Sequence, residues 1–257
     1  MAASKIKFKI LTDKFPDLLS KLEDLTKIDD NIKLKIDKDD ILMYSMVGDS
    51  SILAFKSYIV KTSEYLGFED FDFTLDVIIP SAKKFVRNLS FLKGDKIVLE
   101  VTYKESDDSS TCYSRNLVFN GGKLKVQLIP GEEREMRDIT KEQLDSRLNL
   151  KNKKWSFAIE RGEFNDIKRL ASNNSDGRIL AVTVVGGRIT MSENHVWELE
   201  VGETGSKNSS LMFNKSFLSS INDGSTPVEF NMFETFILIK DDNSNLMISF
   251  ECDFSNE

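Results

Sequence analysis

The chain has 257 residues, of which 40% are hydrophobic and 10% aromatic, and its net charge is −7 at pH 7. This composition supports an ordinary hydrophobic core, and the low count of 4 prolines and 13 glycines excludes a fibrous or disordered chain. No apolar run approaches the ~20 residues that cross a bilayer, and the N-terminal sequence lacks the apolar core of a signal peptide. Cys112 and Cys252 share no motif spacing, so we expect free thiols and a cytoplasmic protein without a membrane partner.

The first half of the chain predicts two similar runs, each of strands and one helix. Apolar residues at Phe15, Leu18, Leu22 and Leu25 follow the three-and-four spacing of an amphipathic helix. The elements expected in the first run are a strand at 5–11, a helix at 12–28, and strands at 31–37, 41–47 and 51–60. Those expected in the second run are a strand at 71–79, a helix at 80–92, and strands at 96–103, 113–119 and 123–129.

Residues 127–153 break this pattern, because they are polar and rich in both signs of charge. Thr140 and Gln143 have the spacing of a helix capping box. We predict an interdomain connector over 127–153, between an N-terminal domain at 1–126 and a C-terminal domain at 154–257. The elements expected in the second half are helices at 161–173 and 214–221, and strands at 155–159, 179–185, 188–192, 195–201, 210–213, 228–233, 235–240 and 245–252.

The two halves repeat one another. At an offset of 149, the recurring pairs are Phe8 and Phe157, Ile10 and Ile159, Phe15 and Phe164, and Asp17 and Asp166. A chain that repeats strand, helix and strands at half its length contains two copies of one domain. We therefore predict an α+β fold of two similar domains, each built from two β-α-β-β-β units.

The catalytic inventory is thin. His195 is the one histidine, and as part of an expected strand it is better explained as an ordinary strand residue. The sequence contains neither a phosphate-binding P-loop nor a nucleophile elbow. Asp37, Asp39 and Asp40 begin like a calcium loop but lack its later glycine and glutamate, which favours a solvated hairpin tip. We expect no enzyme, no metal site and no cofactor.

Positive charge is concentrated on the expected helices. The net charges of the four expected helices add up to +4, so the remainder of the chain carries a net charge of −11. On a helical wheel, Lys83, Lys84 and Arg87 oppose the apolar stripe of 80–92, which contains no acid. A solvated charged face explains any one helix, whereas a shared basic surface explains the four together at least as well. Such a surface binds a polyanion through its phosphates, without reading its sequence.

In its internal repeat, its four short helices after strands and its connector, the chain resembles a DNA sliding clamp. The resemblance is to the T-even bacteriophage clamp and proliferating cell nuclear antigen, and it covers nearly the whole chain. Its most clamp-like stretches are 15–25 followed by 32–43, and 164–170 followed by 179–191. The resemblance implies the DNA-clamp fold and a head-to-tail homotrimer, with helices on the inner face around double-stranded DNA and sheets outside. The length leaves no room for the three domains of a bacterial clamp.

The resemblance also implies two sets of functional residues. The residues expected to face DNA are Lys14, Lys21, Lys83, Lys84, Arg87, Arg161, Lys168, Arg169 and Lys215. The residues expected in a partner-peptide groove are Leu128, Ile129, Pro130 and Phe254, for which ordinary edge packing is an equal explanation. The implied partners are a DNA polymerase and an ATP-driven clamp loader. The first helix departs from the pattern, because Asp13, Asp17 and Asp24 share its surface.

Three functions remain in order of preference. The first is a processivity factor that keeps a polymerase on its template by encircling the DNA. The second is a β-rich structural or adaptor protein, including a viral one, whose duplication is unrelated to DNA. The third is an enzyme with an unrecognised site. Charge reversal at Lys83, Lys84 and Arg87 separates the first from the second, because only a clamp needs those cations.

Overall fold

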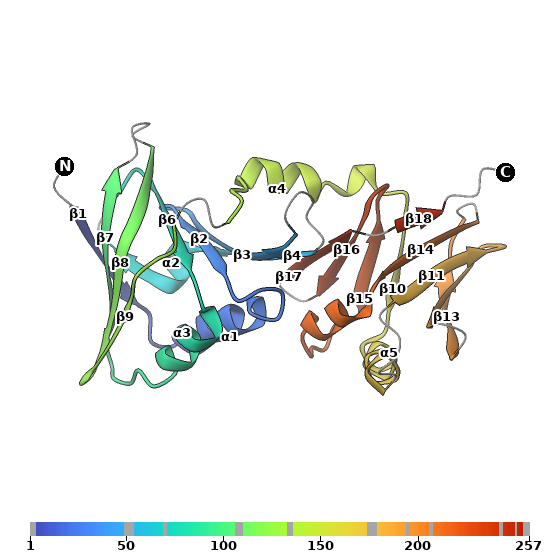
Figure 1. Ribbon diagram of the computed structural model, residues 1–257, viewed down its shortest axis with the longest axis horizontal. Coiled ribbons are helices and arrows are strands. Elements are labelled where there is room, and N and C mark those ends of the chain that lie inside the picture. The colour runs from blue at the N-terminus through green and yellow to red at the C-terminus, as the bar shows by residue number, and fades with distance from the viewer. Residues whose placement is uncertain are drawn as a thin grey trace. The chain divides into compact units, whose positions relative to one another are not determined.

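The computed structural model describes residues 4–48, 54–68, 71–105, 110–132, 136–173, 179–193, 196–205, 208–241, 244–249 and 251–253. It divides into two compact units, one of residues 1–46 and 57–139, the other of residues 47–56 and 140–257. Strands dominate both units and helices are few, which confirms the predicted α+β class (Figure 1). His195 and Phe254 lie outside the described residues.

The first unit is built on one sheet. Its strands follow the hydrogen-bonded order β4-β3-β2-β6-β8-β7-β1-β5, and β9 pairs with β8. The pairing of β6 with β8 is parallel. The antiparallel pairs are β1–β5, β1–β7, β2–β3, β2–β6, β7–β8 and β8–β9. The bounds are β1 (Ser4–Ile10), α1 (Phe15–Leu25), β2 (Ile32–Ile36), β3 (Asp40–Val47), β4 (Ala54–Lys61), α2 (Thr62–Tyr65), β5 (Leu66–Phe68), β6 (Thr74–Ile79), α3 (Ala82–Leu89), β7 (Ile97–Glu105), β8 (Thr111–Gly121) and β9 (Leu124–Leu128).

Helices α1 and α3 lie next to each other on one face of this sheet (Figure 1). Each turns its apolar stripe inward, so that Phe15 and Leu22 of α1 and Phe85 and Leu89 of α3 join one buried cluster with the strands. The polar residues between these positions are left on the outer side of each helix. The helix amphipathicity read from the sequence therefore decides which side chains reach solvent here.

Cys112 lies in β8 and belongs to the same buried cluster, with 1% of its surface exposed. Burial raises the pKa of its thiol above the ordinary value of 9.0, and the carboxylates of Glu105 and Asp72 add to the shift. The Cys112 thiol therefore stays protonated and is shielded from solvent, in keeping with the free cysteine expected from the sequence.

The second unit contains the connector helices and two strand groups. The strands β10-β15-β16-β17 are neighbours in one group, and β13-β12-β11-β14-β18 form a five-stranded sheet. The bounds are α4 (Lys141–Arg147), η2 (Leu150–Asn152), β10 (Trp155–Ile159), α5 (Arg161–Asn173), β11 (Ile179–Val185), β12 (Arg188–Glu193), β13 (Trp197–Glu203), β14 (Ser209–Asn214), η3 (Lys215–Ser220), β15 (Val228–Met232), β16 (Phe236–Asp241), β17 (Ser244–Ser249) and β18 (Glu251–Asp253).

The repeated residues occupy corresponding elements of the two units. Phe8 in β1 and Phe157 in β10 are buried strand residues, and Phe15 and Phe164 are buried in the first turn of α1 and α5. The predicted capping box is also present in α4, where the Gln143 amide nitrogen donates to Thr140 Oγ1 at 3.2 Å and the Thr140 amide nitrogen to Gln143 Oε1 at 3.1 Å.

Four elements differ from the sequence prediction. The strand expected at 245–252 is divided into β17, which pairs with β16, and β18, which pairs with β14. The helix expected at 12–28 is shorter, because residues 12–14 form turns before Pro16 and the helix ends at the Thr26 cap. The helix expected at 214–221 is the 3₁₀ helix η3. Residues 62–68 form the short α2 and β5 instead of a loop, and β5 pairs with β1. Short segments of this kind are set by their tertiary neighbours more than by local periodicity.

Candidate nucleic-acid interface and partner site

Helix α3 carries the strongest cluster of exposed cations predicted from the sequence. Lys83, Lys84 and Arg87 are all exposed, and among the described residues none of their side chains forms an ion pair. Asp30 fixes the start of the helix, since the Lys83 amide nitrogen donates to Asp30 Oδ1 at 2.7 Å. Three uncompensated charges on a rigid helix are suited to phosphate contacts.

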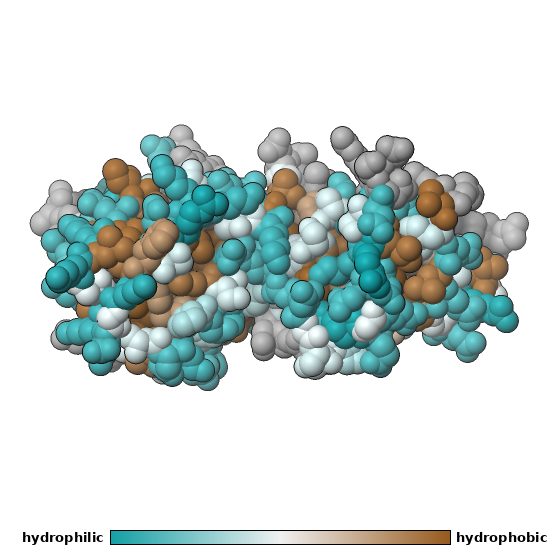
Figure 2. All heavy atoms as spheres, turned by 90° about the horizontal axis from the view of Figure 1, so that it is seen from below, coloured by the Kyte–Doolittle hydropathy of each residue, from teal (hydrophilic) through white to brown (hydrophobic). Residues whose placement is uncertain are grey.

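The surface around this helix is mixed in character. On the side of the first unit seen in Figure 2, hydrophilic side chains surround an apolar patch. The turn that follows α3 adds Lys93 and Lys96, which are exposed and which the sequence analysis did not single out. Their position in the sequence could have identified them, because both lie within seven residues of the end of α3 at Leu89. The exposed Asp95 lies between them, so this turn extends the basic surface by a net charge of about one.

Lys21 of α1 is bonded within its own unit. Its Nζ lies 2.6 Å from Asp17 Oδ1, and 5.6 and 5.9 Å from the ring centroids of Tyr58 and Tyr65. The Tyr65 hydroxyl also donates to Asp17. Burial alone would raise the pKa of Asp17, but the bonds from Lys21 and Tyr65 outweigh it and hold the pKa below the ordinary 3.8. Only 11% of the Lys21 side chain is exposed, so it is poorly placed to reach DNA.

A second acid of α1 also serves the fold. Asp24 is 3% exposed and accepts a hydrogen bond of 2.5 Å from the Tyr58 hydroxyl, while Lys27 Nζ lies 3.1 Å from its other oxygen. Two of the three acids that made α1 look unlike a DNA-facing helix, Asp17 and Asp24, thus bind tyrosines and lysines of the same unit. Lys14, at the N-cap, remains exposed as expected.

Arg161 was expected among the surface cations, but the structure buries it. The sequence places it beside the apolar stripe of α5, but its side chain is buried, at 7% exposure. Its Nε donates to the Thr226 carbonyl and its Nη1 to the Asn222 carbonyl, both at 2.8 Å. The guanidinium therefore ties α5 to the segment between η3 and β15, and it is not available at the surface.

Lys168 and Lys215 are likewise held by the second unit. Lys168 Nζ donates to the Ile221 carbonyl at 2.8 Å and lies 3.3 Å from Asp223 Oδ1. Lys215 forms an ion pair with Glu193, a carboxylate that is completely buried. Of the predicted cations in this unit, Arg169 is the exposed one, with 72% of its side chain accessible. Its charge is paired with Asp166 on the same helix.

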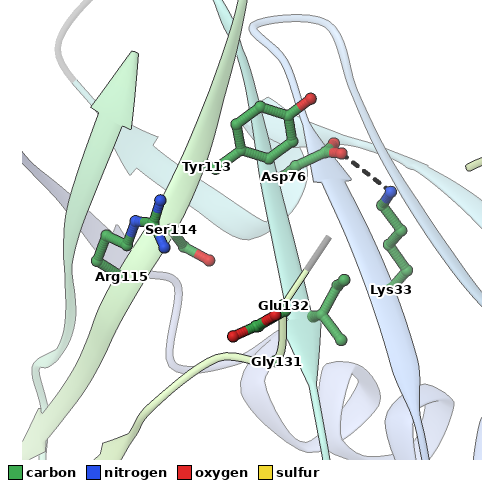
Figure 3. Close-up of a pocket in the computed structure, with 8 residues that line it drawn as sticks. Lys33, Asp76, Tyr113, Ser114, Arg115, Gly131 and Glu132 are labelled. Atoms are coloured by element: carbon green, nitrogen blue, oxygen red, sulfur yellow. Dashed lines mark ion pairs between the residues drawn. The ribbon is translucent and has the colours of Figure 1, made fainter. Parts of the chain in front are cut away.

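The residues proposed for a partner groove begin the connector. Leu128 ends β9 and packs against the core, Pro130 is half-buried, and Ile129 is 74% exposed. Phe254 lies outside the described residues, so its place in such a groove is untested. A polar pocket of about 440 Å³ follows directly (Figure 3). It is lined by Lys33, Asp76, Ile78, Tyr113, Ser114, Arg115, Gly131 and Glu132.

This pocket lies where the sheet divides. β6 and β8 are paired only from Thr74 with Thr111 to Asp76 with Tyr113, after which β8 continues with β9. The connector bridges the division, because the Gly131 amide nitrogen donates to the Ile78 carbonyl at 3.1 Å. The mixed charges of the lining suit a polar segment of a partner better than a purely apolar one.

The described residues also bear on metal binding and on membrane insertion. They contain no group of three or more His, Cys, Asp or Glu side chains arranged to hold a metal ion. Over the same residues, none of the helices has the length and apolar character that a membrane span requires. The Asp37 side chain instead caps its own turn, accepting from the amide nitrogens of Asp39 and Asp40 at 2.8 and 2.7 Å.

Comparison with known proteins finds similarity in structure alone. No family model and no curated protein matches the sequence. The DNA polymerase sliding clamp of Bacillus subtilis superposes with a TM-score of 0.66 at 11% identity, over 99% of this chain and 67% of that chain. The DNA polymerase III beta chain of Streptococcus pneumoniae gives a TM-score of 0.62 at 12% identity, over 98% and 66%.

An archaeal clamp matches over its full length. The PCNA2–PCNA3 complex of Sulfolobus tokodaii contains a chain with a TM-score of 0.58 at 14% identity, and the match covers 96% of this chain and 99% of that one. By contrast, the chain spans about two thirds of the length of the two bacterial clamps, 67% and 66%. The fold of this chain is thus similar to that of all three of these proteins. The chain has the fold of a DNA polymerase sliding clamp.

Proposed function

We propose that this protein is a DNA sliding clamp that encircles duplex DNA and tethers a replicative DNA polymerase. The observation that carries the proposal is the coincidence of the clamp fold with three exposed, unpaired cations on α3. Cations on a helix bind phosphates without reading sequence, which leaves a ring free to slide. The protein itself does no chemistry in this role, because the encircling topology is what keeps a polymerase on its template.

The proposed assembly is a head-to-tail homotrimer, closed by sheet edges. In the described residues, β9 pairs only with β8 and β13 only with β12, so each strand has one open edge. The exposed charges on these edges are opposite: β9 and its turn carry Lys123 and Lys125, and β13 carries Glu198, Glu200 and Glu203. Edge-to-edge pairing of two copies would satisfy both backbones and set opposite charges side by side.

Light scattering tests the assembly first. A mass near three times 29.3 kDa supports the ring, whereas a monomer at the highest concentration argues strongly for the adaptor alternative. We expect the pair Lys123→Glu and Lys125→Glu to give monomers, and the further changes Glu198→Lys and Glu200→Lys in the same chain to restore the trimer. Failure of the four-fold variant to reassemble would contradict pairing by these two edges.

Retention on DNA tests the encircling role. A closed ring loaded on nicked circular DNA stays bound through gel filtration at moderate salt and is lost when the circle is linearised. Equal loss from circular and linear DNA would contradict encirclement. The partners that the role requires are an ATP-driven clamp loader and the polymerase, at sites of replication in the cytoplasm, or in the host cytoplasm for a bacteriophage protein.

The competing proposal is a β-rich structural or adaptor protein. The polar pocket beside the connector favours it, since a docking site needs no ring. The two proposals diverge at α3. Reversing the charge of its three cations leaves partner docking intact in an adaptor but lowers DNA retention by at least about tenfold in a clamp.

A further inference from the structure

The outer face of β2 carries two lysines that a central strand would not ordinarily keep. Ile32, Leu34 and Ile36 turn into the core, so Lys33 and Lys35 point to the opposite face of the sheet. That face is covered, because Lys33 is only 2% exposed and 15% of the Lys35 side chain is accessible. A buried ammonium is costly unless carboxylates and hydrogen bonds compensate it.

The compensation comes from two different parts of the unit. Lys33 Nζ lies 3.1 Å from Asp76 Oδ2 in β6 and 2.6 Å from Asp138 Oδ1 in the connector. Lys35 Nζ lies 2.8 Å from the same Asp138 oxygen. Burial alone would lower the pKa of Lys33, but these carboxylates outweigh it and the pKa is raised, so the side chain stays charged.

A tyrosine holds the residues on either side of Asp138. Tyr44 in β3 is fully buried, and its hydroxyl donates to the Arg137 carbonyl at 3.2 Å and accepts from the Ile139 amide nitrogen at 3.1 Å. Lys33 and Tyr44 are directly paired in the β2–β3 register. Three consecutive connector residues, 137–139, are therefore each hydrogen-bonded to neighbouring positions of two adjacent strands.

Two residues of this group, Lys33 and Asp76, line the pocket beside the connector. Lys33 and Asp76 face it together, as the ion pair drawn in Figure 3 shows, and Gly131 and Glu132 of the connector lie at its border. The connector is thus fixed at two points of one sheet, at Gly131 on β6 and at 137–139 on β2 and β3. The pocket lies beside the attachment at Gly131, and Lys33, which lines it, also binds Asp138 in the attachment at 137–139.

We infer that Lys33 and Tyr44 are positioning residues that anchor the connector on the sheet and thereby set the shape of the pocket beside it. The anchor is made of charge and hydrogen bonds, so it fixes one register of the connector where apolar contact alone would allow sliding. The anchor itself goes beyond the proposed function. Its use, to present a connector of fixed path to a partner segment, rests on that function.

Hydrogen exchange followed by mass spectrometry tests the anchor in the full-length protein. We expect Tyr44→Phe and Asp138→Asn each to speed exchange of the peptide at 137–139, which contains the hydrogen-bonded Ile139 amide, by about tenfold, because each removes bonds that hold this segment. Exchange in β2, β3 and β6 should stay at the wild-type rate. Asp138→Glu keeps the charge and should recover at least part of the protection.

Two matched variants serve as controls. Tyr58→Phe removes another buried tyrosine hydroxyl, and Asp40→Asn removes another lysine–aspartate pair, that with Lys61 at 2.7 Å. Neither should change exchange at 137–139. If Lys33→Met does not fold, Tyr44→Phe and Asp138→Asn still decide the question, because Asp138 is half exposed.

Wild-type exchange at 137–139 in both decisive variants would overturn the inference, as would uniform loosening of the whole unit. Oligomeric mass and retention on circular DNA are measured on the same samples. Loss of protection with mass and retention unchanged supports the anchor. A wild-type protein that neither trimerises nor stays on circular DNA refutes the proposed function, while the exchange data still judge the anchor.

Discussion

Helices α3 and α5 carry basic residues that look alike in sequence and behave differently in the structure. On α3, three cations stand on the solvent side of the helix without partners among the described residues. On α5, Arg161 and Lys168 turn back to carbonyls at 221–226, and Arg169 is paired with Asp166. Basic enrichment of a helix can therefore mean a ligand surface or an internal fastening. What separates them is whether a carbonyl or carboxylate lies within reach.

Lys215→Ala has the largest expected effect, and it tests whether a cation of the second unit serves the fold. Removing one partner leaves the completely buried Glu193 carboxylate without its ammonium, which costs about 3–5 kcal/mol. We expect urea unfolding of the second unit at clearly lower concentration. The control removes both charges, as Lys215→Met with Glu193→Gln, and should cost less. Normal stability combined with weakened DNA retention in Lys215→Ala would instead make Lys215 a DNA contact.

Charge reversal on α3 tests the other side of the comparison. We expect Lys83→Glu, Lys84→Glu and Arg87→Glu together to reduce DNA retention by at least about tenfold, because up to three phosphate contacts are lost. The slope of the logarithm of the binding constant against the logarithm of the salt concentration should become shallower by about 0.9 per lost contact. Thermal stability should be unchanged, since all three side chains are exposed.

The matched control for α3 has the same change in charge elsewhere. Lys151 and Lys153 of the connector and the adjoining Lys154 are exposed, and their reversal to glutamate should leave retention near the wild-type value. Equal effects of the two triple variants would show that net charge matters and that the α3 surface does not.

Acid titration sharpens the account of α1. The pKa of Asp17 is held below 3.8, so its bonds to Lys21 and Tyr65 stabilise the fold above that pH. This stability is lost as the pH falls through the lowered value in the folded protein. We expect the free energy of unfolding of Asp17→Asn to depend less on pH between 4 and 2 than that of the wild type. Identical pH profiles would contradict a structural role for this acid.

The smallest expected effect is at Arg169. Its partner Asp166 is 59% exposed, and exposed pairs of this kind contribute about 0–1 kcal/mol. Asp166→Asn frees the guanidinium, and we expect stability within error of the wild type with a gain of no more than about twofold in DNA affinity. Titration by fluorescence anisotropy at fixed salt measures it. A large loss of stability would show that this pair stabilises the fold, as the bonds of Arg161 and Lys168 do.

Periodic segments were predictable because local chemistry determines them. Residues 155–159, 161–173 and 179–185 form the expected strand, helix and strand with the expected bounds. Gly186 and Gly187 make the turn between the strands expected at 179–185 and 188–192. Both glycines have positive φ, at 57° and 86°, which other residues rarely adopt. The short segment 62–68 carries no comparable period and takes its structure from pairing with β1.

The partners of the cations were beyond the reach of the sequence. A helical wheel shows the face on which Arg161 lies, but not that the carbonyls of 222 and 226 meet it there, 61 and 65 residues later. The same limit applies to α1. The sequence shows that Asp17 and Asp24 would repel DNA, but not that Tyr65 and Tyr58 bind them. For Lys83, Lys84 and Arg87 the wheel suffices, because a solvent-facing side chain needs no distant residue to define its place.

The shielded thiol of Cys112 makes the proposed ring suitable for covalent crosslinking. Since it is buried and its pKa is raised, mild oxidants and maleimides should pass it by. With Cys252 replaced by serine, new cysteines at Lys125 and Glu198 would then be the reactive pair. Oxidation would link copies across the two edges, and a circle of DNA threaded through the sealed product would survive detergent that strips every non-covalent complex.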